Sequence, residues 1–525
     1  MPVCSSAHAR PRRWVALVVG LVLLAQPGLA QRVPLGPEVN SDLYDESAPL
    51  LSADGTQLWF WSSERPDGFG IQDIYYTQLD SVGSWLPAQN LGLPLNTPDC
   101  NIALSVTPDG NQLLVYRRNT RPGYSDLALA RKYPQGWGPP SSLKIEGFES
   151  QGASGITAYL GADGLTLLLS VYTDQGLGRE DLYVCFYDSQ KRTWSRPLNL
   201  GPTLNTPGSE TTPFLAPDGL TLYFSSTEHG SLGGDDVYVS RRLDDSWTRW
   251  SRPVNLGPTL NSPGDDYYFK FPADAEYGYL VSNHERPTRD IFRVKLPPSA
   301  LPKPVLQIKG RVLDQETGQP LAARVRYEDL ATGQDAGAAL TDTVTGEYRI
   351  LLPAGTQIGF SAEAPGYMAI SENLTIQLPP GKRFDQASRD LRLAQLKTGQ
   401  KIRLNNLFFA SGQATLQPTS LPELRRLVAI LKQNPDMVIE VGGHTDAIGT
   451  DEINLPLSAA RAQAVVTYLY ENGIASTQAF AKGYGSSQPV GSNATAEGRA
   501  QNRRVDDHMD CIRIRNQDPI LAFAE

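Results

Sequence analysis

The sequence contains little cysteine and little histidine. There are four Cys and five His among 525 residues, and Cys4 lies in an N-terminal segment that we expect to be removed. The remaining Cys100, Cys185 and Cys511 allow at most one disulfide bond and leave one thiol over. No CxxC pair, HExxH helix or GxSxG turn occurs. The sequence therefore predicts no disulfide framework, no metal site, no cofactor and no catalytic motif of these types.

Positive charge is also scarce. Lys and Arg number 47 against 56 Asp and Glu, which gives a formal net charge of −9. A chain with this net negative charge lacks the positive electrostatic potential that would attract a phosphate backbone. We therefore expect no nucleic-acid partner.

Long apolar runs are absent beyond the N-terminus. Three arginines precede an apolar run from Trp14 to Ala25, and Gly28-Leu29-Ala30 supplies the small residues typical of a cleavage site. About twelve apolar residues are too few to span a bilayer. Residues 1–30 are therefore predicted to be a signal peptide, and the mature chain, starting near Gln31, is predicted to be periplasmic without a transmembrane span. Because no cysteine stands at the cleavage site, we expect no lipid-anchored N-terminus.

An internal repeat organises the first half of the mature chain. Its markers, 54–56 residues apart, are Asp54-Gly55, Asp109-Gly110, Asp163-Gly164, Asp218-Gly219 and an altered copy, Asp274-Ala275. Each unit combines an LGxxLN-type stretch, two apolar strands around the Asp-Gly turn, a third strand and a Trp-containing strand. Glycine tolerates the positive φ that a tight hairpin turn requires. Four short strands cannot bury a core alone, so this period predicts units stacked radially as in a β-propeller.

The repeats resemble the WD40-like units of the periplasmic TolB propeller, whose motif is P/A-D-G followed by an apolar strand. This chain has the motif as TPDG, APDG and SADG. The resemblance implies an all-β propeller of about five blades over residues 31–298, with six blades as the alternative. Propeller loops commonly bind proteins, so we expect partners in the outer membrane or the secretion machinery.

Other functions of the repeats stay open. A hydrolase or lyase would need converging acids or histidines, but His229 and His284 are isolated and are interpreted as surface residues. A glycan-binding unit would need Trp residues on one face. Asp235-Asp236 and Asp265-Asp266 have the chemistry for Ca²⁺, although paired loop carboxylates are more often solvated turn residues. The prediction is a protein-interaction platform without enzymatic activity.

Residues 304–394 follow a proline-rich linker and alternate as short strands. Three stretches, GRVLDQETGQPL (310–321), TGEYRILLPAG (345–355) and APGY (364–367), are similar to the carboxypeptidase-regulatory, transthyretin-like domains. The resemblance implies a β-sandwich that acts as a spacer or an interaction module.

From residue 397 onward the pattern is mixed α/β. Residues 423–435 place apolar side chains at helical spacing and end at Pro435. Residues 437–443 and 479–485 are predicted strands. A second helix is predicted from a cap at Ser458 to Tyr470, with Asn472-Gly473 ending it.

Four stretches of this region resemble the OmpA C-terminal domain family. They are LFFASGQATLQP (407–418), GHTDAIGTDEINLPLSAARAQAV (443–465), GYGSSQP (483–489) and NATAEGRAQNRRV (493–505). The resemblance implies an α/β domain over residues 397–516 that binds the diaminopimelate peptide of peptidoglycan non-covalently and tethers an outer-membrane-associated complex to the wall.

In that family the Asp of the HTD motif and the Arg of LSxxRA contact the ligand, and they match Asp446 and Arg461. Arg503, in the NRR motif, matches a further contact. The chain departs from the family at Ala410, where relatives often have Asp, so that contact is made by the backbone or lost. It also departs in DDHMDCIRI (506–514), which is more polar than the usual final strand.

The chemistry of Asp446 and Arg461 suits a zwitterion. Diaminopimelate carries an ammonium and a carboxylate on one carbon, which one carboxylate and one guanidinium fork at a fixed separation would recognise. We expect Arg461 in the first turn of the helix capped by Ser458, where the helix N-terminus adds positive potential, and we expect the pair to line an open notch. A structural salt bridge is the alternative interpretation.

Four neighbours complete the predicted site. Thr445, Asn454 and Leu457 are expected to shape the loop and the walls. His444 has no partner carboxylate and no second histidine, so it is interpreted as structural.

Overall fold

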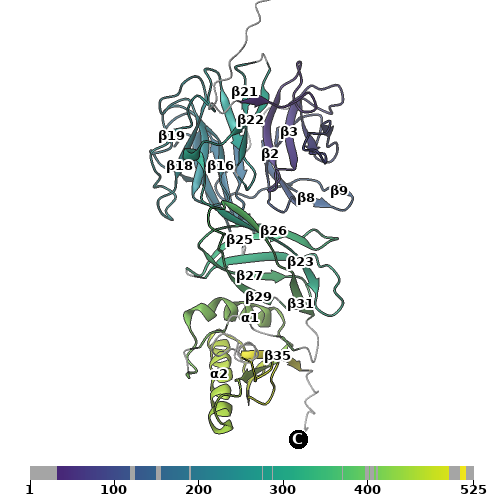
Figure 1. Ribbon diagram of the computed structural model, residues 1–525, viewed down its shortest axis with the longest axis vertical. Coiled ribbons are helices and arrows are strands. Elements are labelled where there is room, and N and C mark those ends of the chain that lie inside the picture. Colours follow the sequence, from purple (N-terminus) through teal and green to yellow (C-terminus); the bar gives the residue numbers. More distant parts are fainter. Residues whose placement is uncertain are drawn as a thin grey trace, which may run out of the picture.

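The computed structural model describes residues 32–118, 125–148, 155–188, 191–274, 276–285, 288–330, 332–368, 370–395, 401–402, 407–409, 412–495 and 509–515. The predicted signal peptide, Ala410 and Arg503 lie outside these ranges. Three bodies follow one another along the long axis of the molecule (Figure 1). None of the helices within these ranges has both the length and the hydropathy to cross a membrane.

The first body contains five antiparallel sets of strands, one for each sequence repeat. The first set is β2 (Glu46–Leu51), β3 (Gln57–Ser63), β4 (Gln72–Gln78) and β5 (Gln89–Asn90). The second is β6 (Cys100–Val106), β7 (Gln112–Arg118), β8 (Ser125–Tyr133), β9 (Gly136–Trp137) and β10 (Ser141–Ser142). A parallel pairing of Gln72 with Cys100 joins these two sets into one nine-stranded sheet.

The other three sets form separate sheets. The third contains β11 (Thr157–Leu160), β12 (Thr166–Val171), β13 (Asp181–Asp188), β14 (Thr193–Trp194) and β15 (Leu198–Asn199). The fourth contains β16 (Glu210–Leu215), β17 (Thr221–Ser226), β18 (Asp236–Arg241) and β19 (Val254–Asn255). The fifth contains β20 (Asp266–Lys270), β21 (Tyr277–Ser282) and β22 (Asp290–Lys295), completed by β1 (Val33–Pro34) from the start of the chain.

The first and fifth repeats lie next to each other. β1 pairs with β22, and the Glu46 N–H donates to the Arg289 carbonyl oxygen at 2.8 Å. Strands from the two ends of a 260-residue segment therefore share hydrogen bonds, which ties the last repeat to the first.

The repeated Asn and Asp-Gly residues have structural roles. The Asn205 amide accepts from the Leu182 N–H at 2.8 Å and donates to the Leu182 carbonyl oxygen at 3.0 Å. The same reciprocal pair joins Asn40 to Ile291, Asn96 to Ile74 and Asn261 to Val237. The turn glycines have φ between +66° and +73°, as the sequence predicts.

The second body consists of two sheets that share one hydrophobic core. One contains β23 (Val305–Asp314), β26 (Glu347–Pro353), β28 (Tyr367–Met368), β30 (Phe384–Ser388) and β31 (Leu391–Gln395). The other contains β24 (Arg324–Asp329), β25 (Gln334–Leu340), β27 (Gln357–Glu363) and β29 (Ile370–Thr375). Ile308 and Ile350 of the first sheet and Val325 and Phe360 of the second are buried together.

The Asp-Gly turns of the repeats attach the first body to the second. Arg349 pairs with Asp54 at 3.2 Å, the Leu340 N–H donates to Asp109 Oδ2 at 3.1 Å, the Ala338 N–H to the Asp163 carbonyl oxygen at 2.7 Å and the Lys303 N–H to Asp218 Oδ2 at 2.7 Å. Three successive repeats therefore contact the second body through the same turn, and the fourth contacts the connection that leads into it. The short 3₁₀ helix η1 (Pro298–Ala300) lies in the connection between the two bodies.

The third body is an α/β domain. Its sheet has the order β32 (Lys401–Ile402), β35 (Met509–Arg515), β33 (Val438–His444), β34 (Ala479–Gly485), in which β33 and β34 are parallel. The 3₁₀ helix η2 (Pro418–Ser420) leads into α1 (Leu421–Gln433), and α2 (Asp451–Glu471) follows β33. Leu424, Leu431, Val441, Val465 and Leu469 pack in one core. A final strand, β35, forms despite its polar sequence.

The prediction for the start of the second helix was wrong. α2 begins at Asp451, with Thr450 in an extended conformation before it, and Pro456 lies inside the helix. Ser458 is therefore no cap but a buried residue in the middle of α2. Asp451 and Glu452 in the first turn complement the helix dipole, and a proline at the sixth position removes one backbone donor without ending the helix.

Candidate functional site

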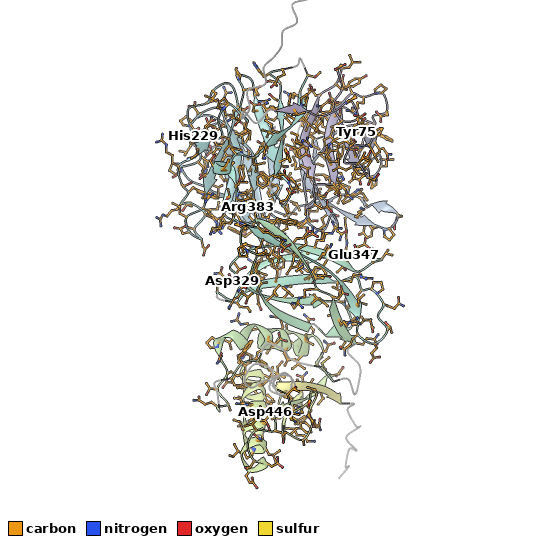
Figure 2. The ribbon with its side chains drawn as sticks, in the orientation of Figure 1. Tyr75, His229, Asp329, Glu347, Arg383 and Asp446 are labelled. Atoms are coloured by element: carbon orange, nitrogen blue, oxygen red, sulfur yellow. The ribbon has the colours of Figure 1, made fainter. Side chains whose placement is uncertain are left out.

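Asp446 lies in the loop that joins β33 to α2, within the third body (Figure 2). Its Oδ1 accepts a hydrogen bond from the Ile448 N–H at 2.8 Å. Asn454 Nδ2 donates to the carbonyl oxygens of Asp446 at 3.4 Å and Ile448 at 3.1 Å. Asn454 therefore ties the loop that carries the Asp446 carboxylate to the beginning of α2.

Arg461 lies on the same face of α2 as Asn454. The two residues are seven positions apart, which is two turns, or about 10 Å along the helix axis. Helical side chains lean toward the helix N-terminus, so the Arg461 side chain leans toward Asn454. Its Nε donates to the Gln413 carbonyl oxygen at 2.9 Å, and its guanidinium carbon lies 5.5 Å from the centre of the Phe409 ring.

The expected open notch is not what the structure shows. Asp446 is 4% exposed and Arg461 is 1% exposed. Arg461 lies in the third turn of α2 and contacts Phe409 and Gln413, so it is covered, and the helix N-terminus at Asp451 is too far away to act beside it. The segments that contact the pair reach the surface, because residues 447–450, which follow Asp446, and residues 412–413 are exposed.

Thr445, Leu457 and His444 are the other predicted residues that the structure describes. The Thr445 N–H donates to the Gly485 carbonyl oxygen at 2.9 Å, and half-buried Leu457 lies between Asn454 and Arg461 on α2. The His444 ring stacks on the Tyr484 ring with centroids 5.0 Å apart. Tyr484 donates to Glu440 Oε1 at 2.5 Å, and burial together with this bond raises the pKa of Tyr484. These contacts agree with a structural role for His444.

Ser458 and two glycines position α2 against the sheet. A Cβ on Gly443 would lie 2.0 Å from the Ser458 carbonyl oxygen, and one on Gly483 would lie 2.6 Å from the Ala459 nitrogen. Ser458 Oγ accepts from the Gly485 N–H at 2.9 Å. The site's geometry depends on this close approach, which the sequence analysis missed. The sequence signal for this close approach is a pair of glycines, Gly443 and Gly483, which lie opposite each other on the parallel strands β33 and β34.

We expect Gly443→Ala to destabilise the third body by about 3 kcal/mol, because the added methyl group cannot be accommodated without moving α2. Hydrogen–deuterium exchange of the α2 amides measures this change. Ala460→Gly, on the exposed side of α2, is the reference substitution and should destabilise the third body by about 1 kcal/mol. Equal exchange protection in Gly443→Ala and the wild type would contradict the close approach.

The OmpA family model matches residues 408–503. This part of the chain is an OmpA family domain. The peptidoglycan-binding protein ArfA of Mycobacterium tuberculosis is 39% identical over 142 residues, which cover 26% of this chain and 42% of ArfA. The probable lipoprotein YiaD of Escherichia coli is 38% identical over 113 residues, which cover 21% of this chain and 52% of YiaD. The chain thus spans about half the length of these relatives.

Several solved structures are similar to part of this chain. The cell wall anchor of the T6SS from Pseudomonas aeruginosa is 32% identical, with 22% of this chain and 80% of that chain covered and a TM-score of 0.19. A score of this size does not establish a shared fold for the whole chain. The family match lies within the OmpA-like domain, at residues 408–503.

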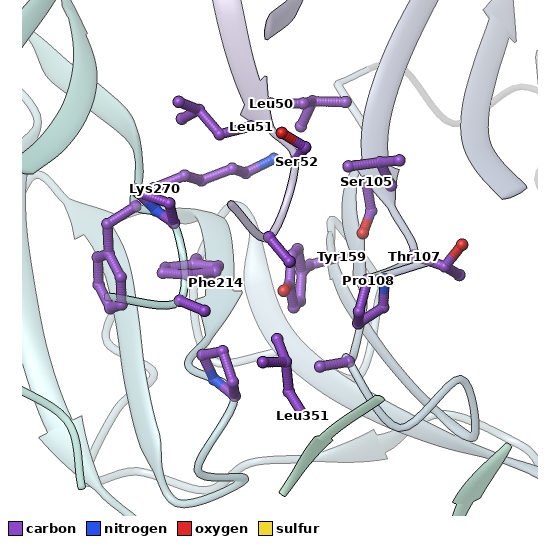
Figure 3. Close-up of a pocket in the computed structure, with 17 residues that line it drawn as sticks. Leu50, Leu51, Ser52, Ser105, Thr107, Pro108, Tyr159, Phe214, Lys270 and Leu351 are labelled. Carbon is purple, nitrogen blue, oxygen red and sulfur yellow. The ribbon is translucent and has the colours of Figure 1, made fainter. Parts of the chain in front are cut away.

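Outside the OmpA-like domain, a cavity of about 50 Å³ lies where the five repeats meet (Figure 3). Its lining includes Leu50, Ser105, Tyr159, Phe214 and Lys270, one residue from the first strand of each repeat, and Leu351 from the second body. The cavity is too small for a substrate and is covered by the second body.

Lys270 is buried beside this cavity. Its Nζ donates to the Leu104 carbonyl oxygen at 2.5 Å and lies 5.6 Å from the centre of the Tyr159 ring. Burial lowers the pKa of Lys270 to about 7, because an apolar surrounding disfavours the ammonium form.

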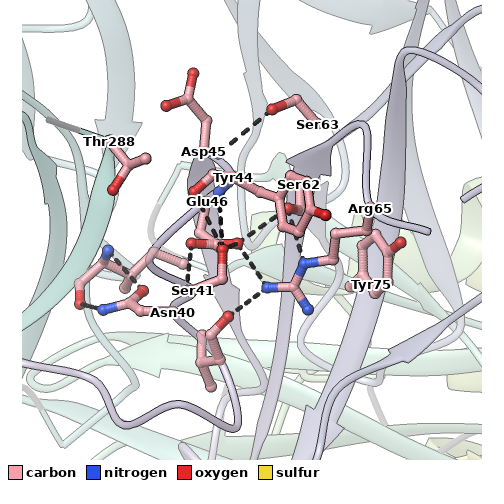
Figure 4. A network of polar contacts seen from close by, with 12 residues as sticks. Asn40, Ser41, Tyr44, Asp45, Glu46, Ser62, Ser63, Arg65, Tyr75 and Thr288 are labelled. Atoms are coloured by element: carbon pink, nitrogen blue, oxygen red, sulfur yellow. Dashed lines mark hydrogen bonds and ion pairs between the residues drawn. The ribbon is translucent and has the colours of Figure 1, made fainter. Parts of the chain in front are cut away.

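Buried carboxylates at the other end of the repeats join loops to strands (Figure 4). Glu46 accepts from Arg65 at 2.6 Å, from the Ser62 hydroxyl at 3.0 Å and from the Ser41 N–H at 2.9 Å. Burial raises the pKa of Glu46 although Arg65 opposes this. Glu210 similarly binds Thr206 and Ser226 in the fourth repeat. These contacts are structural.

Of the residues considered for metal binding in the repeats, Asp235 and Asp265 lie next to each other, and the Asp235 N–H donates to Asp265 Oδ1 at 3.3 Å. No group of three or more His, Cys, Asp or Glu side chains suited to a metal occurs in the part of the chain that the structure describes. Burial and the neighbouring Asp265 raise the pKa of Asp235 to about 6. The His229 ring hydrogen-bonds the Leu204 carbonyl oxygen at 2.8 Å, and Cys100 and Cys185 are free thiols.

Proposed function

We propose that this chain binds the diaminopimelate peptide of peptidoglycan non-covalently through its OmpA-like domain. The observation that carries the proposal is the family match over residues 408–503 together with 39% identity to a protein named for peptidoglycan binding. The chemistry proposed is recognition without covalent change, so the chain is not an enzyme.

The proposed contacts use two charged residues, Asp446 in the loop before α2 and Arg461 within α2. The Asp446 carboxylate accepts from the ligand's ammonium, and the Arg461 guanidinium donates two parallel hydrogen bonds to its carboxylate. Asn454, whose amide binds the carbonyl oxygens of Asp446 and Ile448, keeps the first of these groups in register with the helix. Thr445 and Leu457 line the approach, and Arg503 adds a contact from outside the described residues.

A ligand can reach the side chains of Asp446 and Arg461 only if the segments that contact them move. The Arg461 Nε is bound to the carbonyl oxygen of Gln413, an exposed residue, and Asp446 is followed by four exposed residues. We propose that the ligand displaces these surface loops and that its carboxylate replaces the Gln413 carbonyl as an acceptor.

We further propose that the chain tethers an envelope complex to the cell wall. In this proposal the five repeats form a closed β-propeller, and its end opposite the Asp-Gly turns engages an outer-membrane or secretion-machinery protein. That end is the free one, because the Asp-Gly turns contact the second body. The second body is then a sandwich-type spacer, and the mature chain is periplasmic and associated with the outer membrane.

Cosedimentation of the mature chain with purified sacculi tests the wall-binding proposal. Sacculi with diaminopimelate in their stem peptides should retain the protein, whereas sacculi with lysine at that position should retain at least tenfold less, because lysine lacks the second amino-acid head group. A soluble diaminopimelate tripeptide should compete. Equal retention on both sacculi would refute recognition of diaminopimelate.

A further inference from the structure

A second cavity lies where the second and third repeats meet the second body. Its volume is about 330 Å³, which is in the range of small-molecule sites. Leu129, Ser142 and Trp194 line it from the repeats, and Arg324 and Leu340 line it from the second body. The wall from the second body is held by the hydrogen bonds of Leu340 to Asp109 and of Ala338 to Asp163.

Every charged side chain that lines this cavity is cationic. Lys144, Arg192 and Arg324 belong to the lining, and it includes no Asp or Glu. This excess is opposite to the net charge of the whole chain, which is −9. Lys144 and Arg192 are exposed at the rim, whereas Arg324 is half-buried. Three cations on one cavity repel one another, so the arrangement favours an anionic occupant.

Arg324 lies against an aromatic ring that is itself packed in place. Its guanidinium carbon lies 5.9 Å from the centre of the Tyr187 ring, and Tyr187 packs on buried Trp194 with ring centroids 5.3 Å apart. Its Nε is buried and has no hydrogen-bond partner within the ranges that the structure describes. Its cross-strand neighbour Glu363 is exposed and forms no ion pair with it there. The guanidinium is therefore oriented by packing, while its buried Nε–H finds no acceptor among the described residues.

We propose that this cavity binds an oxyanion, a carboxylate or a phosphate, carried by a molecule of about monosaccharide size. The Arg324 fork would donate two parallel hydrogen bonds to the oxyanion, and Lys144 and Arg192 would supply further charge. The rim hydroxyls of Ser141 and Ser142 are close enough to line the same space. Because the walls come from two bodies, the bound molecule would also hold the repeats against the second body.

Isothermal titration calorimetry of the full mature chain tests this proposal with three probes: glucuronate, glucose 6-phosphate and glucose. At least one of the two anions should bind, and glucose should not. Binding by glucuronate alone assigns a carboxylate ligand, and binding by glucose 6-phosphate alone assigns a phosphate ligand. Arg324→Gln and Lys144→Gln should each weaken binding at least tenfold, and raising the salt concentration should weaken it further.

Arg311→Gln is the matched control, because Arg311 is an exposed arginine of the second body that does not line the cavity. It should bind the anion like the wild type. Lys144 lies at the exposed rim, so its substitution tests the site even where Arg324→Gln disturbs folding. The proposal is overturned if neither anion binds, or if both variants retain the wild-type affinity.

Discussion

Asp446→Asn is expected to release the mature chain from diaminopimelate-containing sacculi, with a loss of affinity of about 30-fold or more. The substitution removes the negative charge that would face the ligand's ammonium, and removing one member of a desolvated charge pair costs about 2–5 kcal/mol. Asparagine still offers an oxygen to the Ile448 N–H, which Asp446 Oδ1 accepts at 2.8 Å, so the loop should keep its conformation. Cosedimentation over a range of sacculus concentrations measures the change.

Two further variants separate recognition from folding. Asp436→Asn removes a charge from an exposed position of the same domain and should bind sacculi like the wild type. Arg461→Lys keeps the positive charge but loses the fork, and it should also lose most of the affinity. Because Arg461 is buried, circular dichroism must show that this variant is folded. Wild-type retention by both Asp446→Asn and Arg461→Lys would mean that this pair does not contact the ligand.

Lys270→Met is expected to stabilise the first body by roughly 2 kcal/mol at pH 7.5. The pKa of Lys270 is lowered from 10.5 to about 7 in the folded chain. Between these two values the unfolded chain binds more protons, so the wild type should gain stability as pH rises from about 7 to about 10.5. Below pH 7 the ammonium is buried and its full cost remains. Methionine removes this cost, offset in part by the lost hydrogen bond to the Leu104 carbonyl oxygen.

Tryptophan fluorescence during urea unfolding measures this effect selectively. Seven of the eight Trp lie between Trp59 and Trp250, in the repeats, and the eighth is Trp14 in the predicted signal peptide. Lys309→Met, at an exposed position of the second body, is the control and should leave both the midpoint and its pH dependence unchanged. If Lys270→Met kept the wild-type rise in stability between pH 7 and pH 10, Lys270 would not be the group responsible.

Several local features could be predicted from the sequence because they depend on neighbouring residues. The turn glycines adopt the positive φ that their Asp-Gly pairs indicate. β34 occupies the predicted segment, α1 begins and ends two residues before the predicted 423–435, and α2 ends at the predicted Asn472-Gly473. The start of α2 was misplaced because Ser458 suggested a cap, whereas Thr450, Asp451 and Glu452 supplied a start eight residues, or about two turns, earlier.

The environment of the candidate site was not predictable in the same way. The spacing of Asp446 and Arg461 indicated a charged pair, but buried Arg461 contacts Phe409 and Gln413, which lie about fifty residues away from it in the sequence. The role of Ser458 depends on Gly485 in another strand. Likewise, Lys144, Arg192 and Arg324 carry no signal of their own and gather only where two bodies meet.

The sequence by itself determined the repeat period, the turn conformations and the membership of residues 408–503 in the OmpA family, because these follow from residue identity and short-range spacing. Only the tertiary structure decided that the Asp-Gly turns contact the second body and that Lys270 and Arg461 are buried. Burial and long-range contacts are properties of the packed chain, and the free energies that shift a pKa or orient a guanidinium arise from that packing.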